Sequence, residues 1–245
     1  MRTIGVTGGA GFIGGHVIDN LLAAGHDVIS FDHLGRRHRD DYETMLGDVR
    51  DPVAMVELAA HCDGIIHLAA VLGTQETIQN PTPAVDTNIR GGLNFLEAIS
   101  QYDIPGVYIA VGNHWMNNAY SISKTAVERF CRMHVDYRGT RVGVVRAVNA
   151  YGPRQVAAAP YGPGKVRKIM PAFICRALSG APIEVYGDGE QVSDMVYVAD
   201  VAQALVSTLQ SCDQGKVPER VIEVGPFQHH AVNEVAEVVC RAAMD

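Results

Sequence analysis

A glycine-spaced turn follows the first apolar run of the chain and constrains its fold more than any other feature. The β-branched run at residues 3–7 leads into glycines at positions 8, 11 and 14, and an amphipathic, helix-period segment follows. A dinucleotide pyrophosphate needs a tight turn off a strand, a bare backbone and the free N–H groups of a helix N-terminus. The sequence therefore predicts a dinucleotide-binding turn, whose residues are Gly8, Gly11, Phe12, Ile13 and Gly14.

A carboxylate at the end of the second apolar run indicates which dinucleotide binds. Asp32 follows the run at residues 28–31, about 20 residues beyond the turn, as in dinucleotide-binding units. A carboxylate at this place accepts hydrogen bonds from both ribose hydroxyls and repels a 2′-phosphate. We therefore expect NAD rather than NADP as the cofactor.

Apolar runs of strand length alternate with helix-period segments along most of the chain. Strands are predicted at residues 28–31, 43–46, 64–68, 107–111 and 141–148, and helices at residues 11–24, from 52 onward, 84–102 and 119–138. Strands separated by helices imply right-handed crossovers and a parallel sheet that is covered on both faces. The predicted fold is α/β, a Rossmann-type doubly wound parallel sheet.

The pattern changes after residue 150. Residues 151–168 form a loop rich in Gly, Pro and Ala, after which we expect helices at 169–178, 200–209 and 233–243 and strands at 183–186, 195–198 and 221–224. Loops of this length in compact domains are usually functional or mobile. We predict an NAD-binding Rossmann domain of residues 1–150, to which residues 195–225 return. Residues 151–194 and 226–245 are predicted to form a small, interleaved substrate-binding lobe.

Composition and charge narrow the possible partners. The net charge of −7 argues against nucleic acid as the main partner, because phosphate binding needs clustered cations. The sequence holds no apolar run of about 18 residues, so we expect no membrane span. The cysteines are scattered and the histidines lack ligand spacing, so we expect no metal site. A strand begins within three residues of the N-terminus, which leaves no room for a signal peptide and predicts a cytoplasmic protein.

The spacing of Tyr120 and Lys124 predicts a catalytic pair. At i and i+4 of a helix the two side chains lie on one face, about 6 Å apart between Cβ atoms. An adjacent ammonium and the positive nicotinamide ring favour the phenolate, so the pKa of Tyr120 is expected to fall from about 10 toward neutral pH. The same lysine can hydrogen-bond the nicotinamide ribose. Such spacing alone also fits an ordinary surface pair, but its place after the fifth strand of a dinucleotide fold favours catalysis.

These motifs resemble those of the extended short-chain dehydrogenase/reductase family, the NAD-dependent sugar-nucleotide epimerases and dehydratases. The matching stretches lie at residues 7–14, 47–51, 67–70, 87–91, 120–124, 146–153, 185–190 and 196–201. The resemblance implies that Asn149 lies near the diphosphate of a sugar nucleotide. The residues that it adds to the cofactor site are Asp48 and Val49 at the adenine, Leu68, Ala69 and Ala70 along the dinucleotide, and Asn88 nearby.

Three departures from the family pattern bear on the reaction. The fifth strand ends in residues 109–115 with neither a hydroxyl nor a carboxylate, where the family usually has a Ser/Thr pair or Thr-Asp-Glu. Fewer residues than usual separate this strand from Tyr120. Ser193 stands where the family commonly has an Arg that grips the diphosphate. The chain also stops at Asp245, earlier than typical members, so we expect part of the substrate lobe to be trimmed or absent.

Two residues are candidates to replace the missing hydroxyl. Asn113 can donate and accept hydrogen bonds, and His114 can transfer a proton near neutral pH, so either could orient the substrate. The alternative is that both are loop residues that lead into the next helix.

The predicted function is NAD-dependent epimerisation of a nucleotide-activated sugar. Tyr120 would take the proton of a ring hydroxyl while hydride passes to NAD, and the hydride would return to the opposite face of a 4-keto intermediate. The enzymatic alternatives are a ketone or alcohol oxidoreductase and a sugar-nucleotide dehydratase. An alternative of another class is a catalytically weak NAD- or ligand-binding sensor or assembly protein.

A homodimer is also expected. In relatives of this kind the helices predicted at 84–102 and 119–138 pair across a two-fold axis. The candidate contact residues on these helices are Leu93, Leu96, Val127 and Phe130.

Overall fold

A seven-stranded parallel sheet forms the core of residues 1–148 and 198–224, which make up one compact unit, unit 1. Residues 149–197 and 225–245 form unit 2. The computed structural model describes residues 1–37, 39–162 and 168–244. The unit boundaries differ by two or three residues from the predicted 150 and 195, because β7 (Asn149–Tyr151) and β8 (Met195–Tyr197) pair with each other. Residues 195–197 therefore belong to unit 2.

The order of strands in unit 1 confirms the doubly wound sheet. The order is β3-β2-β1-β4-β5-β6-β9, and all neighbours are parallel. The chain runs outward from β1 to one side and then starts again at β4 on the other, so the topological switch point lies between β1 and β4. The strands are β1 (Thr3–Thr7), β2 (Asp27–Asp32), β3 (Glu43–Leu46), β4 (Gly64–His67), β5 (Gly106–Val111), β6 (Val142–Ala147) and β9 (Ile222–Val224).

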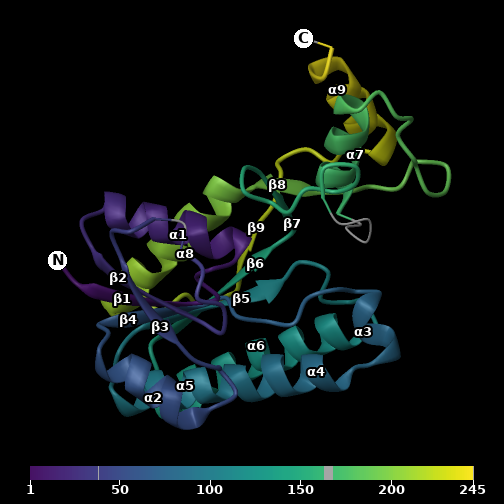
Figure 1. Cartoon of the computed structure of the whole chain (residues 1–245). Coiled ribbons are helices and arrows are strands. Elements are labelled where there is room, and N and C mark those ends of the chain that lie inside the picture. Colours follow the sequence, from purple (N-terminus) through teal and green to yellow (C-terminus); the bar gives the residue numbers. More distant parts are fainter. Residues whose placement is uncertain (38, 163–167, 245) are drawn as a thin grey trace. The chain divides into compact units, whose positions relative to one another are not determined.

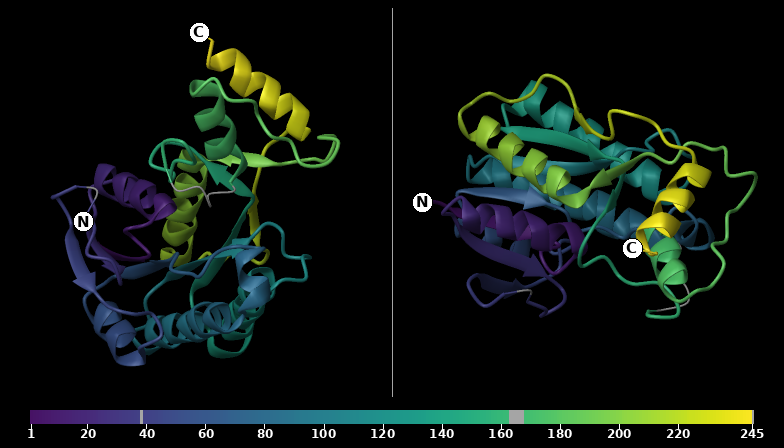
Figure 2. Two further views of the ribbon diagram at one scale, coloured as in Figure 1. Left: turned by 45° about the vertical axis from the view of Figure 1, so that its right-hand side comes forward. Right: turned by 90° about the horizontal axis from the view of Figure 1, so that it is seen from above.

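Helices cover both faces of this sheet (Figures 1 and 2). One face carries α1 (Phe12–Ala23) and α8 (Val198–Asp213), and the other carries α2 (Pro52–Ala60), α5 (Gly91–Gln101) and α6 (Ala119–Arg138). Leu96 and Val127 are fully buried in the core beneath the second helical layer. Of the four candidate residues for a dimer contact, these two are therefore part of the core and are not available for such a contact.

The predicted helix at 84–102 is three shorter segments. They are α4 (Thr82–Ala84), the π-helical η1 (Val85–Arg90) and α5, and a further turn, α3 (Glu76–Gln79), precedes them. The helix predicted at 119–138 is α6, with the predicted bounds. The Asn118 side chain caps α6 by accepting a hydrogen bond from Ser121 N, and Gly139 ends it with a φ of +67°. Both ends follow the usual capping chemistry.

Unit 2 is built on two helices and the β7–β8 pair. Phe173 on α7 (Ile169–Leu178) packs with Val232 and Val239 on α9 (Val232–Ala242). The predicted strand at 183–186 is irregular. Its apolar residues, Ile183 and Val185, pack against this small core instead of pairing with a strand. Of the predicted loop at 151–168, residues 163–167 lie outside the described residues.

Candidate functional site

The turn between β1 and α1 leaves no space for side chains. Gly8 has a φ of +73°, and a Cβ placed there would lie 2.8 Å from Ala69 N. A Cβ on Gly14 would lie 2.3 Å from the Gly8 carbonyl oxygen. Both contacts are with backbone atoms, which cannot rotate away. Glycine is therefore required at both positions, and the bare backbone is open to close approach by a pyrophosphate.

The start of α1 is also suited to an anion. Gly11 is the N-cap residue and supplies no side-chain hydrogen bond to the first turn. Phe12 and Ile13 are the first helical residues, and both are half-buried. The first N–H groups of a helix have no partner within the helix and carry partial positive charge. This end of α1 can hold a phosphate through its backbone alone.

Asp32 is a buried carboxylate that backbone groups hold in place. Its side chain is 7% exposed. Its Oδ2 accepts a hydrogen bond from Ala10 N at 3.1 Å, and its Oδ1 accepts one from Leu34 N at 3.0 Å. His33 Nδ1 lies 3.2 Å from Oδ1. The carboxylate is thus fixed at the end of β2, beside the glycine turn, with lone pairs left for ribose hydroxyls.

Thr7 ties the end of β4 to the end of β1. Its Oγ1 accepts hydrogen bonds from Leu68 N at 3.1 Å and Ala69 N at 3.3 Å, and it lies 2.9 Å from His67 Nδ1. With its oxygen accepting twice, the hydroxyl donates its proton to His67 Nδ1. The half-buried segment Leu68–Ala70 is therefore held next to the glycine turn at the switch point.

Asp48 and Val49 differ in how accessible they are to a ligand. The Asp48 carboxylate accepts hydrogen bonds from Arg50 Nε at 3.0 and 2.9 Å, and this guanidinium lowers the pKa of Asp48. The pair is about half exposed, and such pairs contribute little to stability, so a ligand can replace it. Val49 is buried in the core, and its carbonyl accepts a hydrogen bond from Asn94 at 2.9 Å.

Asn88 is a buried cross-link. Its Oδ1 accepts a hydrogen bond from Val71 N at 2.7 Å, and its Nδ2 donates to Val71 O at 3.1 Å and to Ser123 Oγ at 2.9 Å. Both amide hydrogens are therefore used within the protein. Asn88 therefore ties the loop after β4 to α6, and its Oδ1 keeps a second lone pair with which it could accept a hydrogen bond from a cofactor.

The backbone around Tyr120 is anchored from three sides. Tyr120 lies in the first turn of α6, beneath the Asn118 cap. Its backbone N–H donates to Thr77 Oγ1 at 3.3 Å, and its carbonyl accepts from Ser123 Oγ at 2.9 Å. Thr77 and Ser123 are both buried. These bonds hold the backbone of Tyr120 in place. Thr77 connects it to α3, and Ser123 and Asn88 connect it to η1.

Burial dominates the electrostatics of Tyr120 and Lys124. It raises the pKa of Tyr120 to about 12 and lowers the pKa of Lys124 to about 7. The Lys124 ammonium lies over the Tyr108 ring, 4.2 Å from its centroid. The expected fall in the pKa of Tyr120 is therefore wrong for the protein by itself, because desolvation disfavours both charged forms.

The end of β5 explains the missing hydroxyl. A Cβ at Gly112 would lie 2.9 Å from Val148 Cγ1 and 3.0 Å from the Ala147 carbonyl oxygen, so a serine or threonine at this position would require its neighbours to shift. The half-buried His114 places its Nδ1 3.1 Å from the Gly112 carbonyl oxygen. A carbonyl only accepts, so Nδ1 carries the proton and Nε2 remains an acceptor. The Asn113 carbonyl accepts from Met116 N at 3.2 Å, which makes this segment a tight turn.

Asn149 belongs to unit 2, whereas the other predicted site residues belong to unit 1. Its exposed side chain donates to the Asp194 carbonyl oxygen at 2.9 Å. The Asp194 carboxylate in turn lies 2.7 Å from His229 Nδ1, and His230 Nδ1 lies 3.2 Å from a Glu234 carboxylate oxygen. Each histidine thus has a carboxylate partner, His229 from Asp194, which is distant in sequence, and His230 from Glu234, four residues further along the chain.

Sequence reasoning missed several residues that build the site. Thr7 and His67 are buried polar residues within apolar strand segments, and this contrast is the signal that could have identified them. No local pattern identifies the partners that come from other elements. The missed residues are Thr7, His67, Thr77, Tyr108, Asn118 and Ser123.

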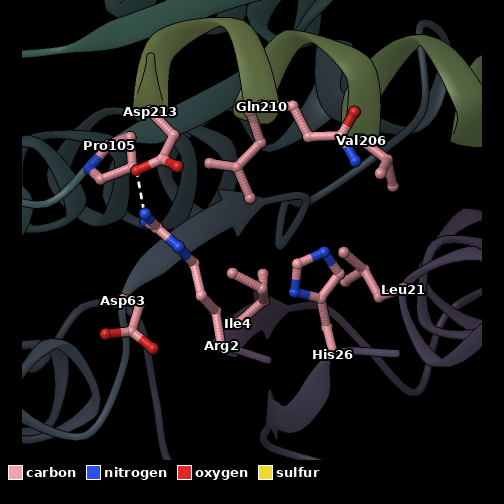
Figure 3. Close-up of a pocket in the computed structure, with 10 residues that line it drawn as sticks. Arg2, Ile4, Leu21, His26, Asp63, Pro105, Val206, Gln210 and Asp213 are labelled. Atoms are coloured by element: carbon pink, nitrogen blue, oxygen red, sulfur yellow. Dashed lines mark hydrogen bonds and ion pairs between the residues drawn. The ribbon is translucent and has the colours of Figure 1, made fainter. Parts of the chain in front are cut away.

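A small cavity lies at the opposite edge of the sheet (Figure 3). It has a volume of about 30 Å³ and lies at the amino ends of β1, β4 and β5, beside the last turns of α8. The Arg2–Asp213 ion pair closes one side, and His26 lines it near Leu21 and Val206 (Figure 3). This volume holds about two water molecules, so the cavity does not fit a dinucleotide.

Metal ligation and membrane insertion have no candidates among the described residues. Within residues 1–37, 39–162 and 168–244, no group of three His, Cys, Asp or Glu side chains is arranged to hold a metal ion. No helix in these ranges combines the length and the apolar character needed to cross a bilayer.

Comparison with known proteins gives one family and several solved relatives. Residues 4–225 match the family described as NAD dependent epimerase/dehydratase. UDP-N-acetyl-alpha-D-glucosaminuronate decarboxylase from Bacillus cytotoxicus is 29% identical over 95% of this chain and 77% of its own length.

The solved structures agree with the family match. The structure of UDP-glucose 4-epimerase from Thermotoga maritima with UDP-glucose is 27% identical, with a TM-score of 0.86 over 99% of this chain and 82% of that one. The structure of the Thermus thermophilus UDP-glucose 4-epimerase in complex with NAD is 28% identical, with a TM-score of 0.80 over 99% of this chain and 84% of that one.

Proposed function

This chain belongs to the NAD-dependent epimerase/dehydratase family, and from that premise we propose that it epimerises a nucleotide-activated sugar at a ring carbon that carries a hydroxyl. It is an NAD-dependent enzyme of a family that acts on sugar nucleotides. The observation that carries the choice of reaction is the end of β5. Elimination of water needs an acid and a base at that place, and the turn at residues 110–114 offers no carboxylate.

The residues at the carboxyl edge of unit 1 fit NAD. Gly8 and Gly14 leave no room for a Cβ, so the turn offers bare backbone to a pyrophosphate, and the first turn of α1 has no side-chain cap. Asp32 would bind the ribose hydroxyls, and residues 68–70 would line the dinucleotide. Asp48 would exchange its Arg50 partner for the adenine. Bound NAD supplies a hydride acceptor that returns the hydride, so the sugar is oxidised and then reduced with no net redox change.

Tyr120 would move the proton. Burial holds it as a phenol at neutral pH, since its pKa is raised to about 12. Positive charge beside it favours the phenolate, and Lys124 on the next helical turn supplies such a charge when protonated. The phenolate would accept the proton of the sugar hydroxyl as the C–H bond breaks, and the phenol would return this proton when the ketone is reduced. The proton thus stays in the site throughout the cycle.

His114 is proposed to orient the substrate in place of a serine or threonine. The bond between its Nδ1 and Gly112 fixes the tautomer, so Nε2 can accept a hydrogen bond from a sugar hydroxyl. We expect His114→Ala to lower kcat about tenfold, the effect of losing one hydrogen bond. Steady-state kinetics at constant NAD would check this, and an unchanged kcat would show that His114 is only a loop residue.

Unit 2 is proposed as the substrate-binding lobe, with Asn149 at the diphosphate. Its side chain is exposed and already donates to a backbone carbonyl, so its second amide hydrogen is available. We expect Asn149→Ala to raise KM for the sugar nucleotide with little change in kcat.

A product that has the same mass as the substrate and retains an isotopic label at C4 would support epimerisation. The purified protein is incubated with UDP-glucose and dTDP-glucose that carry deuterium at C4, and the products are followed by NMR and mass spectrometry. We expect a second epimer of the same mass that retains the deuterium and no accumulation of NADH. Loss of water would indicate a dehydratase, and net NADH would indicate an oxidoreductase. Each of these outcomes would overturn the proposal.

The protein is also proposed to be a homodimer. Ile122 and Met133 on α6 are 57% and 36% exposed, and Phe130 on α6 and Leu93 on α5 are half-buried. Residues 122, 130 and 133 repeat at helical spacing along one face. We expect a dimer at micromolar concentration in sedimentation experiments. The double change of Ile122 and Met133 to Glu should give monomers, whereas Val53→Glu, at a position 72% exposed on α2, should not. A monomeric native protein would contradict this proposal.

A further inference from the structure

We propose that Tyr108 is a positioning residue for Lys124 and that the π face of its ring stabilises the buried ammonium. The importance of this for turnover rests on the proposed function, but the contact itself does not. Tyr108 lies in the middle of β5, and Lys124 lies in the second turn of α6, which packs on that strand. The inference therefore concerns two elements that unit 1 holds together.

The geometry of the pair is that of a cation–π contact in the protein interior. The Lys124 Nζ lies 4.2 Å from the centroid of the Tyr108 ring. Lys124 is 2% exposed and Tyr108 is 0% exposed. The Tyr108 hydroxyl donates to the Lys124 carbonyl oxygen at 3.3 Å. The tyrosine thus holds both the backbone and the charged end of the lysine.

A stack of rings beneath fixes the orientation of Tyr108. The His67 ring lies 5.9 Å from the Tyr108 ring and 4.9 Å from the Phe95 ring, with interplanar angles of 18° and 13°. Burial, and then the charge of Lys124, lower the pKa of His67 to about 3. His67 is therefore neutral and does not add a second cation to this interior.

The other titratable groups near Lys124 do not neutralise it. Burial raises the pKa of the Cys131 thiol, which stays protonated. The Glu128 carboxylate, one turn further along α6, is bound by the Arg146 guanidinium at 2.5 and 2.8 Å. Tyr120 is a phenol at neutral pH. Among the described residues, no carboxylate forms an ion pair with Lys124, so the ring of Tyr108 is the group that faces its charge.

This arrangement explains how an unpaired ammonium is tolerated. Desolvation lowers the pKa of Lys124 to about 7, so the charged form is only marginally favoured at neutral pH. A desolvated cation–π contact favours that charged form, and weakening it should lower the pKa of Lys124 by about one unit. The ring therefore helps to keep Lys124 protonated at the pH at which the proposed reaction needs it.

The chain is well suited to a direct measurement, since its four lysines are Lys124, Lys165, Lys168 and Lys216. Protein labelled with ¹³C at the lysine Cε is titrated by NMR, and Lys124→Met identifies the resonance of interest. The decisive comparison is between Tyr108→Phe and a ring-fluorinated phenylalanine at position 108. The two side chains have nearly the same shape, but fluorination removes the negative charge of the ring face.

We expect the pKa of Lys124 in Tyr108→Phe to match that of the native protein and to fall by about one unit with the fluorinated ring. The alkaline limb of the NADH-binding profile should move by the same amount. Phe95→Leu is the matched control, because it removes a ring from the same stack without touching Lys124, and it should leave the pKa unchanged. Equal pKa values for the two phenylalanine forms would overturn the proposal, and so would an equal shift in Phe95→Leu.

The outcome is separable from that of the proposed function. The NMR titration needs no turnover, so a shifted pKa in a protein that converts no sugar nucleotide would refute the epimerase proposal alone. An active epimerase whose Lys124 is insensitive to the ring would refute the role of Tyr108 alone.

Discussion

Two buried charges at the carboxyl edge of unit 1 are held in opposite ways. Asp32 is held by the backbone N–H groups of Ala10 and Leu34 at the glycine turn. Lys124 has the face of the Tyr108 ring instead. Charge-assisted hydrogen bonds from backbone N–H groups are directional and strong, whereas a cation–π contact is weaker and leaves the N–H donors of the ammonium free to bind a ligand.

Asp32 is therefore a binding group with a fixed orientation, whereas the protonation of Lys124 can respond to a bound ligand. The Asp32 carboxylate has a set orientation before any ligand arrives, which suits selection between cofactors. Lys124 is only partly protonated at neutral pH, since burial lowers its pKa to about 7. Ligand groups that accept its free donors would raise that pKa. Binding of cofactor and protonation of Lys124 are therefore expected to reinforce each other, which would couple the charge beside Tyr120 to an occupied site.

Tyr120→Phe should have the largest effect at the responsive end. The change removes only the oxygen that transfers the proton, and loss of a general acid–base group typically costs about 10²–10⁴-fold in turnover. We expect the upper part of this range, because residues 110–112 at the end of β5 carry no hydroxyl that could replace it. Initial rates on the true substrate measure the loss, while NAD affinity by titration should be almost unchanged. A variant with near-native turnover would assign the proton transfer elsewhere, and His114 would be tested next.

The backbone-built parts of this edge are the parts that the sequence predicts well. The glycine turn, Asp32 and the bounds of α6 follow from local chemistry, because strand-to-helix turns and helix caps depend on residues close in sequence. Asn118 and Gly139, at the two ends of α6, show this directly. The glycine turn and the doubly wound sheet could therefore be predicted without the structure.

The remaining features depend on residues distant in sequence. The π-helical turn around Asn88 reflects bonds to Val71 and Ser123, which no local pattern reveals. The direction of the shift in the pKa of Tyr120 depends on burial, and the Tyr–Lys spacing contains no information about burial. Sequence alone could not separate the core residues Leu96 and Val127 from the other candidates for a dimer contact.

Lys124→Met tests the cost of the responsive charge. The pKa of Lys124 is about 7 in the fold and has an ordinary value of 10.5. Between these values the unfolded chain binds a proton that the fold does not, so stability rises with pH, and below about pH 7 the fold carries the full cost of the buried charge. Replacement by Met should therefore raise Tm at pH 7, by roughly 2–4 °C for each kcal/mol recovered.

The advantage of Lys124→Met should shrink as the pH rises toward and beyond 10.5, where the folded and unfolded forms of the native protein both lose the charge. Thermal unfolding at several pH values checks the trend. The same variant should lose turnover and bind NAD more weakly, because the ammonium is proposed to serve both Tyr120 and the ribose. A stabilising effect that is independent of pH would show that packing, and not charge, is responsible.

Asp32→Asn should have the smallest effect and tests the fixed end of the comparison. The native protein should bind NAD more tightly than NADP, because the carboxylate would face the 2′-phosphate with a like charge. Ala10 N and Leu34 N donate to different carboxylate oxygens, so the single asparagine oxygen can keep only one of these bonds, and circular dichroism should confirm that the variant is folded. Removal of the charge should narrow the preference for NAD over NADP by roughly tenfold, or about 1.4 kcal/mol. Titration with both nucleotides measures this ratio, and Asp48→Asn, which removes a more distant carboxylate, should leave it unchanged.

Arg36 and Arg37, which follow β2 within five residues, would attract a 2′-phosphate and reduce the native preference. If the native protein bound NADP as tightly as NAD, those arginines would outweigh Asp32, and the carboxylate would not be the group that selects the cofactor.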